Sequence, residues 1–236
     1  METQADVTRL VLPATGLVLG IRFAGRATLV EAGVPRALGN TALTGVRTTL
    51  RRMRTSAGGG IVVVAFRELG AAQFFDQPLD ALFGEMIALG ELETPRERSF
   101  VEDRVALAST NAERLAIVDG YLSARLRDRA PDSLVAAATA RIERSGGALR
   151  IRALAKELGT SLDPLEKRFR RAVGASPKQF AKIVRFLRVV RGFEGGASLT
   201  ALAHEAGYFD QPHLDRDFRA FTGEAPERFL LRREHC

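Results

Sequence analysis

The stretch that decides the fold is RALAKELG, residues 152–159, because it occurs a second time as TALAHEAG at residues 200–207. The likeness continues past both glycines, where five further residues recur at matching positions. These pairs are Leu165 and Leu214, Phe169 and Phe218, Gly174 and Gly223, Pro177 and Pro226, and Phe180 and Phe229. A unit repeated at this length indicates one supersecondary module used twice in succession.

Each copy predicts a helix, a tight turn and a second helix. In the first copy an apolar stripe at helical spacing is formed by Ile151, Leu154, Ala155 and Leu158. We expect Gly159 to end this helix in a left-handed conformation and Ser161 to cap the next. The second helix then buries Leu162, Leu165 and Phe169. Two helices joined in this way form a helix-turn-helix, whose second helix can enter the major groove of DNA.

The second copy repeats this scheme with other residues. Gly207 is the expected stop and Asp210 the expected cap, and the buried side chains are Leu214, Phe218 and Phe221. Between the copies, residues 177–193 predict one more helix with an apolar face and a basic face. That helix would be about 25 Å long at 1.5 Å per residue. A rod of this length can hold two recognition helices near successive major grooves, which lie about 34 Å apart.

Residues from about 131 to 232 resemble the DNA-binding domain of the AraC/XylS family of bacterial transcription regulators. The motifs that carry the resemblance are Ser161-x-x-x-Leu165-x-x-x-Phe169, Gly174-x-Ser176-Pro177-x-x-Phe180, the run 203–211 and the run 218–226. The resemblance implies an all-α domain of about seven helices over residues 131–236. It places one helix-turn-helix at about 150–172, a linker helix at 177–193 and the other helix-turn-helix at about 198–221.

The resemblance also implies which side chains face DNA. The residues expected at base edges are Asp163, Glu166, Lys167, Gln211, Pro212, His213, Asp215 and Arg216. Those expected at phosphates are Arg170, Arg171, Lys182, Arg185 and Arg219. Glutamine pairs with adenine, arginine and lysine with guanine, and a carboxylate accepts from cytosine, so these residue types suit a major groove. Three aspartates against two arginines give residues 210–219 a net charge of −1, which predicts one strong and one weak half-site.

Residues 1–95 predict a β-rich, sensor-like domain with short helices, so the fold class of the chain is α+β. Strand-like runs cover residues 17–23, 48–54 and 61–66, and the apolar run 10–21 is interpreted as a buried strand. Gly58, Gly59 and Gly60 indicate a turn, since no phosphate-binding loop spacing surrounds them. Helical character between residues 71 and 95 predicts one or two short helices. This segment resembles the amino-terminal domains that accompany some AraC-type modules.

Residues 96–130 predict a helical connector. One helix carries Phe100, Arg104, Leu107 and Ala108, and the next carries Leu115, Val118, Leu122 and Leu126. The spacing is that of a helical seam. It leaves two alternatives open: packing against the protein's own sheet, or a homodimer through residues 100–126.

Charge and residue usage narrow the class of protein. The net charge is +7, of which residues 1–146 carry +1 and residues 147–236 carry +6. A basic carboxyl-terminal region is typical of nucleic-acid binding. Residues 1–130 contain no histidine, cysteine or tryptophan, so we expect no catalytic site, metal or cofactor there. A single cysteine, Cys236, and the lack of a signal-like leader predict a cytoplasmic protein that does not enter a membrane.

These observations predict a sequence-specific transcription regulator that binds duplex DNA through two tandem helix-turn-helix units. Its amino-terminal domain would respond to a ligand of unknown identity or to a partner, and RNA polymerase is a candidate partner. One alternative is a protein-interaction subunit whose DNA binding has degenerated, made credible by the acidic second recognition helix. Another is a DNA-repair enzyme, since methyl-transfer repair proteins can carry an AraC-like module. That chemistry needs an activated internal cysteine, and the only thiol here is that of Cys236.

Overall fold

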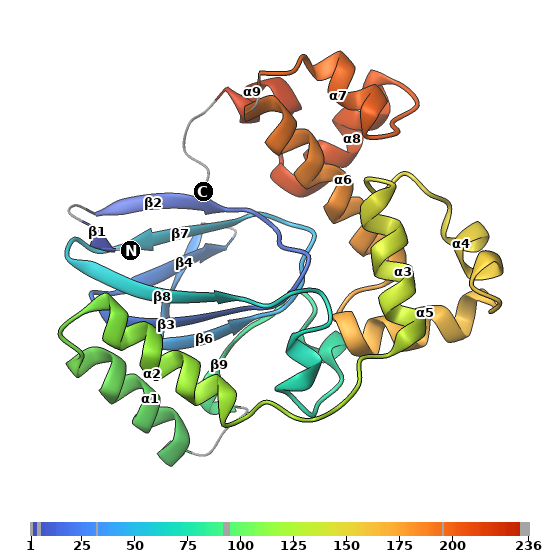
Figure 1. Ribbon diagram of the computed structural model, residues 1–236. Helices are drawn as coiled ribbons and strands as arrows, with labels where there is room; N and C mark the ends of the chain where they lie inside the picture. The colour runs from blue at the N-terminus through green and yellow to red at the C-terminus, as the bar shows by residue number, and fades with distance from the viewer. Residues whose placement is uncertain (1, 4–5, 32, 92–94, 195, 232–236) are drawn as a thin grey trace.

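The computed structural model describes residues 2–3, 6–31, 33–91, 95–194 and 196–231, and it shows a β-sandwich followed by a helical domain (Figure 1). Every strand pairing is antiparallel. One sheet has the order β1-β8-β3-β6-β9 and the other the order β2-β7-β4-β5. The strands are β1 (Glu2–Thr3), β2 (Val7–Val11), β3 (Val18–Ala24), β4 (Ala27–Glu31), β5 (Val34–Leu38), β6 (Thr41–Thr44), β7 (Arg51–Thr55), β8 (Gly59–Ala65) and β9 (Met86–Ala88).

The alternation of residues along β3 explains how the sandwich is layered. Leu19 and Ile21 are completely buried on the outer face of the five-stranded sheet. Gly20 and Arg22, one residue further along, line the space between the two sheets. The period of two in a strand therefore separates an apolar outer face from an inner face that carries an arginine.

The structure corrects several predictions for the amino-terminal part. The run 10–21 is not one strand, because β2 ends at Val11 and Pro13 separates it from β3. The predicted strand at 48–54 begins only at Arg51, and Gly59 and Gly60 belong to β8 rather than to the turn. Residues 71–91 form short 3₁₀ turns, η1 (Ala71–Gln73), η2 (Leu79–Leu82) and η3 (Leu89–Glu91), with β9 between the last two. The one or two short helices predicted between residues 71 and 95 are therefore 3₁₀ turns, interrupted by a strand at Met86–Ala88.

The predicted connector is a pair of helices, α1 (Pro95–Leu107) and α2 (Asn111–Ser123), that cover the outer face of the five-stranded sheet (Figure 1). Thr110 and Glu113 form a capping box at the start of α2. The side chains buried against the sheet include Val101, Val105, Val118 and Tyr121. The predicted seam was only partly right, because Phe100, Leu107 and Leu115 are 60%, 83% and 60% exposed.

The helical domain contains seven helices among its described residues, as expected. They are α3 (Ser133–Arg144), α4 (Ile151–Glu157), α5 (Leu162–Val173), α6 (Pro177–Glu194), α7 (Leu199–Glu205), α8 (Gln211–Thr222) and α9 (Pro226–Leu230). Gly159 and Gly207 have φ of +68° and +73°, so both end their helices in the left-handed conformation that was predicted. Asp210 caps α8 by accepting a hydrogen bond from the His213 N–H at 2.8 Å. Ser161 occupies the cap position of α5, but its side chain makes no capping bond.

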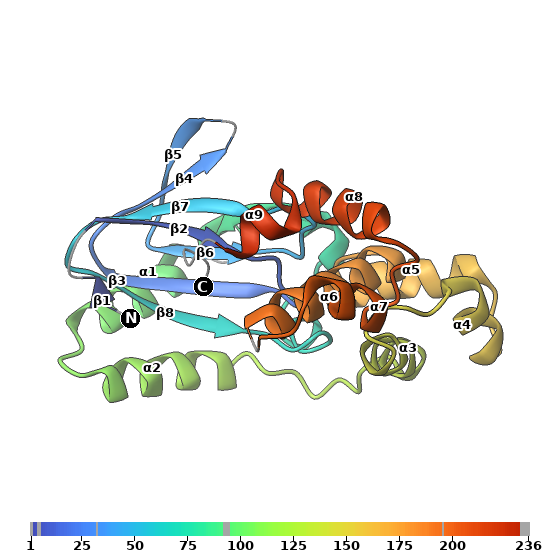
Figure 2. The ribbon, with the colours of Figure 1, turned by 90° about the horizontal axis from the view of Figure 1, so that it is seen from above.

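The two helix-turn-helix units have different cores. The first unit, α4 and α5, packs with α3 and the start of α6 around Phe169 and Phe180, whose rings meet edge-on at 5.5 Å. The second unit, α7 and α8, shares one continuous apolar core with the β-sandwich. The Leu50 N–H, just before β7, donates to the Phe221 carbonyl in the last turn of α8 at 2.9 Å. Seen from above, α8 and α9 lie beside the edge of the sandwich (Figure 2). The second unit is therefore docked on the amino-terminal domain.

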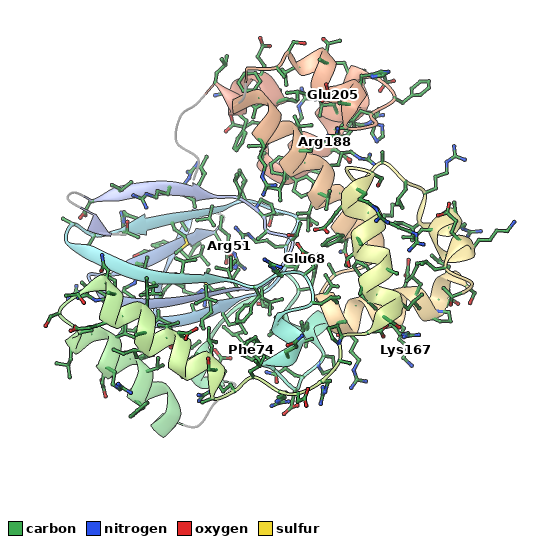
Figure 3. All side chains as sticks on the ribbon, viewed as in Figure 1. Arg51, Glu68, Phe74, Lys167, Arg188 and Glu205 are labelled. Atoms are coloured by element: carbon green, nitrogen blue, oxygen red, sulfur yellow. The ribbon has the colours of Figure 1, made fainter. Side chains whose placement is uncertain are left out.

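Two carboxyls meet at another contact between the domains. Glu68, which follows β8, shares a hydrogen bond with Glu143 of α3, and it accepts a second from the Thr15 hydroxyl at 2.8 Å. Figure 3 shows Glu68 where the sandwich meets the helical domain. Partial burial of the Glu143 carboxyl, together with the negative charge of Glu68 and the hydrogen bond to it, raises the pKa of Glu143 to about 7. The groove beside the pair also contains Arg188, Arg191 and Glu205.

This pair predicts a pH dependence of stability. A carboxyl whose pKa rises on folding contributes its stability below the unfolded value and loses it as pH rises through about 7. We expect about 1 kcal/mol to be lost between pH 5 and 7.5, a small value because Glu143 is exposed and water screens it. In a chain of this size that is a fall in Tm of roughly 2–4 °C.

The measurement is a series of melting curves at pH 5, 6, 7 and 7.5. Glu143→Gln mimics the protonated carboxyl, so it should remove the fall and be more stable than the parent at pH 7.5. Glu157→Gln, at an exposed position on α4, is the matched control and should leave the fall in place. An unchanged pH profile in Glu143→Gln would refute the role of this pair.

Candidate nucleic-acid interface

The first recognition helix, α5, has one buried face and one charged face. Leu165, Phe169 and Val173 are completely buried. Of the predicted DNA contacts on this helix, Glu166 is half-buried and the other four are exposed. The exposed residues are Asp163, Lys167, Arg170 and Arg171. Glu166 lies 3.8 Å from Arg170 in an ion pair one turn apart. In Figure 3 Lys167 points away from the body of the domain, so α5 presents its polar side chains to solvent.

Arg168 on the same helix has a structural role. It donates two hydrogen bonds to Asp132 at 2.7 and 2.6 Å, and Asp132 also caps α3 by accepting from the Val135 N–H at 3.1 Å. Burial opposes ionisation of Asp132, but the bonds from Arg168 and Val135 outweigh it and hold the pKa of that carboxyl below its usual range. The bidentate pair fixes the position of α5 against α3.

The second recognition helix, α8, exposes a mixed surface. Gln211, Pro212, Arg216 and Arg219 are exposed, and His213 and Asp215 are half-buried. Asp215 accepts a hydrogen bond from the Gln211 amide at 3.2 Å and lies 4.0 Å from the Arg219 guanidinium. The His213 ring meets Tyr208 edge-on at 5.1 Å. All the predicted base contacts of this helix therefore lie on or beside its accessible face.

One of the three aspartates that give residues 210–219 their net charge of −1 does not lie on that face. Asp217 is 8% exposed and accepts a hydrogen bond from the Lys182 ammonium on α6 at 2.9 Å. Asp210 faces its own helix N-terminus as a cap. The accessible face of α8 is therefore less acidic than the net charge of −1 indicates, which removes a premise of the expected weak half-site.

The two predicted phosphate contacts on α6 already have partners within the protein. Lys182 pairs with Asp217, and Arg185 donates to the Gly147 carbonyl at 2.7 Å while lying over the Tyr208 ring at 5.0 Å. Gly147 has φ of +80°, and a Cβ there would lie 2.2 Å from the Ala181 carbonyl oxygen. Burial, with the charge of Asp217, raises the pKa of Tyr208. These contacts tie α6 to the turn after α3 and to the second unit.

A basic groove of about 680 Å³ lies between the two units, along α6. Glu166 of the first unit and His213 of the second lie at its walls. The cationic residues that line it are Arg150, Arg152, Lys178, Lys182 and Arg185. Sequence reasoning missed Arg150, Arg152 and Lys178, although each lies at the start of a predicted helix. A groove of this charge can attract a phosphate backbone that passes between two recognition helices.

Phe209 was also missed as a site residue. Its side chain is 94% exposed, and it directly precedes the cap residue of α8. An apolar side chain at the tip of a reading helix can contact a thymine methyl group. The signal in the sequence is a phenylalanine in a turn, outside the apolar stripes of both neighbouring helices.

Comparison with known families decides the class of this domain. A helix-turn-helix domain model matches residues 154–232, which cover the first unit from Leu154 onward, α6 and the whole second unit. Residues 154–232 therefore form a helix-turn-helix domain of the AraC type. No curated protein matches the chain in sequence.

Solved structures of similar fold span both domains. ToxT from Vibrio cholerae, in its P21 crystal form, has a TM-score of 0.54 at 12% identity over 98% of this chain and 95% of that one. ToxT from Vibrio cholerae O395 has a TM-score of 0.51 at 14% identity over 98% and 94%. At these identities the likeness shows a shared fold, a β-rich domain followed by the helical domain. Within the described residues, every helix is too short or too polar to span a bilayer.

Proposed function

We propose that the protein is a cytoplasmic, sequence-specific transcription regulator that binds duplex DNA with α5 and α8 in successive major grooves. The observation that carries this proposal is the basic groove between two recognition helices whose polar faces are accessible. Phosphates bound along that groove would supply affinity for any sequence, and the two helices would supply the choice of bases.

The residues assigned to base edges are Asp163, Glu166, Lys167, Gln211, Pro212, His213, Asp215 and Arg216. Arg170, Arg171 and Arg219 are assigned to phosphates, and we add Arg150, Arg152 and Lys178 from the groove. Lys182 and Arg185 line the same groove. A DNA phosphate can contact Lys182 or Arg185 in two ways. The side chain either leaves its internal partner or binds the partner and the phosphate together.

The amino-terminal domain is proposed to regulate DNA binding. It shares a core with the second helix-turn-helix unit, so a change in the sandwich can reach α8 directly. ToxT from Vibrio cholerae O395 has been solved bound to (E)-4-(8-methylnaphthalen-1-yl)but-3-enoic acid, so a protein of this fold can take up a small molecule. The proposed division is residues 1–95 as sensor, 96–130 as connector and 131–236 as DNA-binding domain.

The exposed apolar side chains of α1 and α2 suggest a second copy of the chain as a further partner besides DNA. Phe100, Leu107 and Leu115 form exposed apolar positions on α1 and α2, which supports a homodimer through residues 100–126. RNA polymerase is proposed as a partner in activation.

The test begins with selection of bound fragments from random duplex DNA by the purified full chain. An enriched sequence followed by a gel-shift titration is the expected result. Arg216→Ala should weaken binding to the best fragment about 10- to 100-fold and relax base choice at one position. Arg170→Ala should weaken all sequences alike and reduce the salt dependence by about one phosphate contact.

Arg36→Ala is the matched control, because Arg36 is exposed on β5, far from the helical domain (Figure 2). It should bind DNA like the parent. Failure to enrich any sequence would instead favour the alternative of an interaction subunit with degenerate DNA binding.

A further inference from the structure

The two helix-turn-helix units differ in the length of their turns. The helix stops Gly159 and Gly207 are 48 residues apart, whereas the cap residues Ser161 and Asp210 are 49 residues apart. The second unit therefore holds one additional residue between its stop and its cap. Because this turn leads directly into α8, the additional residue changes what stands at the tip of that helix.

The longer turn contains one buried and one exposed aromatic side chain. Tyr208 and Phe209 stand there, where the first unit has only Thr160. Tyr208 is 6% exposed, its N–H donates to the Ala203 carbonyl at 2.9 Å, and its ring meets the His213 ring edge-on. Phe209 is 94% exposed. The tyrosine therefore anchors the turn, and the phenylalanine extends into solvent.

The position of Phe209 distinguishes it from other exposed apolar residues. Single apolar side chains on a surface are common and need no explanation. Phe209, however, directly precedes the cap of α8, and the N-terminal residues of a recognition helix are those that contact base edges. In both ribbon views the turn between α7 and α8 lies on the side of the second unit that faces away from the sandwich (Figure 1 and Figure 2). DNA can therefore reach this side chain without displacing the amino-terminal domain.

The backbone at the tip of α8 is held in place by local contacts. Asp210 accepts a hydrogen bond from the His213 N–H at 2.8 Å through its side chain, and its carbonyl accepts from the Leu214 N–H at 3.3 Å. Pro212, in the first turn, restricts the backbone further. An aromatic ring on a fixed backbone has only two side-chain torsions left to order, so it binds at a low cost in conformational entropy.

The chemistry of the Phe209 ring limits which group of DNA it can bind. Phenylalanine offers no hydrogen bond to a base edge and no charge to a phosphate, and the neighbouring Asp210 carboxylate disfavours a phosphate at this point. The major groove presents one apolar group, the methyl group on C5 of thymine. 5-Methylcytosine carries the same group at the same position, whereas uracil and cytosine lack it.

We propose that Phe209 reads the 5-methyl group of a pyrimidine in the half-site of α8. The proposal rests on the proposed function and names one base feature that this function recognises. It assigns the preference to the second unit alone, because Thr160 in the shorter turn is half-buried and carries a hydroxyl group. A cytosine at the contacted position is then bound in a methylation-dependent way.

The test uses the fragment enriched by the purified full chain, with each thymine of the α8 half-site replaced singly by deoxyuridine. That half-site is the one where Arg216→Ala relaxes base choice. Uracil pairs with adenine as thymine does and lacks only the methyl group. One replacement should weaken binding in a gel-shift titration about fourfold, the change that burial of one methyl-sized group supports. A half-site without thymine, or equal binding of all the deoxyuridine fragments, would overturn the proposal.

Variants assign the effect to Phe209. Phe209→Ala should bind the thymine and uracil fragments alike, whereas Phe209→Leu keeps an apolar side chain and should still prefer thymine. Phe100→Ala is the matched control, because Phe100 is 60% exposed on α1, outside the helical domain. It should keep the ratio of the two affinities found in the parent. A thymine preference that survives in Phe209→Ala belongs to another residue and refutes the assignment.

Cytosine methylation provides a second readout. The sensitive thymine–adenine pair is replaced by cytosine–guanine, with and without the 5-methyl group. The parent should bind the methylated fragment about fourfold more tightly, and Phe209→Ala should not distinguish the two. A parent that ignores the methyl group contradicts the proposal. Failure of the full chain to select any DNA would overturn the proposed function as well, whereas selective binding without methyl dependence would overturn only the reading by Phe209.

Discussion

Replacing Phe186 by alanine is expected to cost about 3–5 kcal/mol of folding free energy. Phe186 lies on α6 and is completely buried. Its ring stacks on Phe221 with the centroids 4.5 Å apart and lies 4.9 Å from the Phe218 ring. These rings belong to the core that the second unit shares with the sandwich. The substitution therefore removes packing from the unit and from its docking surface at once.

The measurement is denaturant unfolding followed by circular dichroism, with limited proteolysis to report where the chain opens. Cleavage in Phe186→Ala should concentrate in residues 196–231, because the core of the first unit is separate. The same chemical change in Phe209→Ala provides the control. Phe209 is 94% exposed, so its loss should alter stability by less than about 0.5 kcal/mol and should instead weaken DNA binding. Equal destabilisation by the two variants would contradict the shared core.

The helical domain was largely predictable from sequence because its signals are local. The repeat, the apolar stripes and the glycine stops at Gly159 and Gly207 act within a few residues, and each appears in the structure. Asp217 shows what a charge count overlooks. It falls three residues after Leu214 and four before Phe221, on the buried stripe of α8, so its spacing already placed it inward. Its partner Lys182 lies 35 residues away, and sequence alone gave no means to pair the two.

The amino-terminal domain was less predictable because its structure depends on distant pairings. Strand β9 has three residues and forms only because β6 lies beside it, so its own sequence carries little signal. The buried arginines are a stronger case. Pattern reasoning assigns a charged residue to the surface, whereas Arg47 is held by carbonyls that lie 35 and 36 residues earlier in the chain. The space that Arg22 lines between the sheets could not be predicted either, because its lining residues lie far apart in the sequence.

Lys182→Met is expected to cost about 3 kcal/mol of folding free energy, the usual result of leaving a buried charge without its partner. Asp217 is 8% exposed, and its Oδ2 already has no hydrogen-bond partner, so the bond from Lys182 is its main compensation. Asp217→Asn should cost less, because the Lys182 side chain is 39% exposed and water can solvate its charge. The double variant Lys182→Met with Asp217→Asn should recover much of the loss, since no unpaired buried charge remains.

This cycle also decides what Lys182 does when DNA is bound. If the ammonium stays with Asp217, Lys182→Met lowers Tm and leaves the salt dependence of DNA binding unchanged once only folded protein is counted. If the ammonium contacts a phosphate in the complex instead, Tm of the free protein falls all the same, and the salt dependence of DNA binding falls by about one contact. The 2.9 Å bond to a buried carboxylate favours the first result. In that case the phosphate contacts of the groove are left to Arg150, Arg152 and Lys178, which line the same groove as the pair.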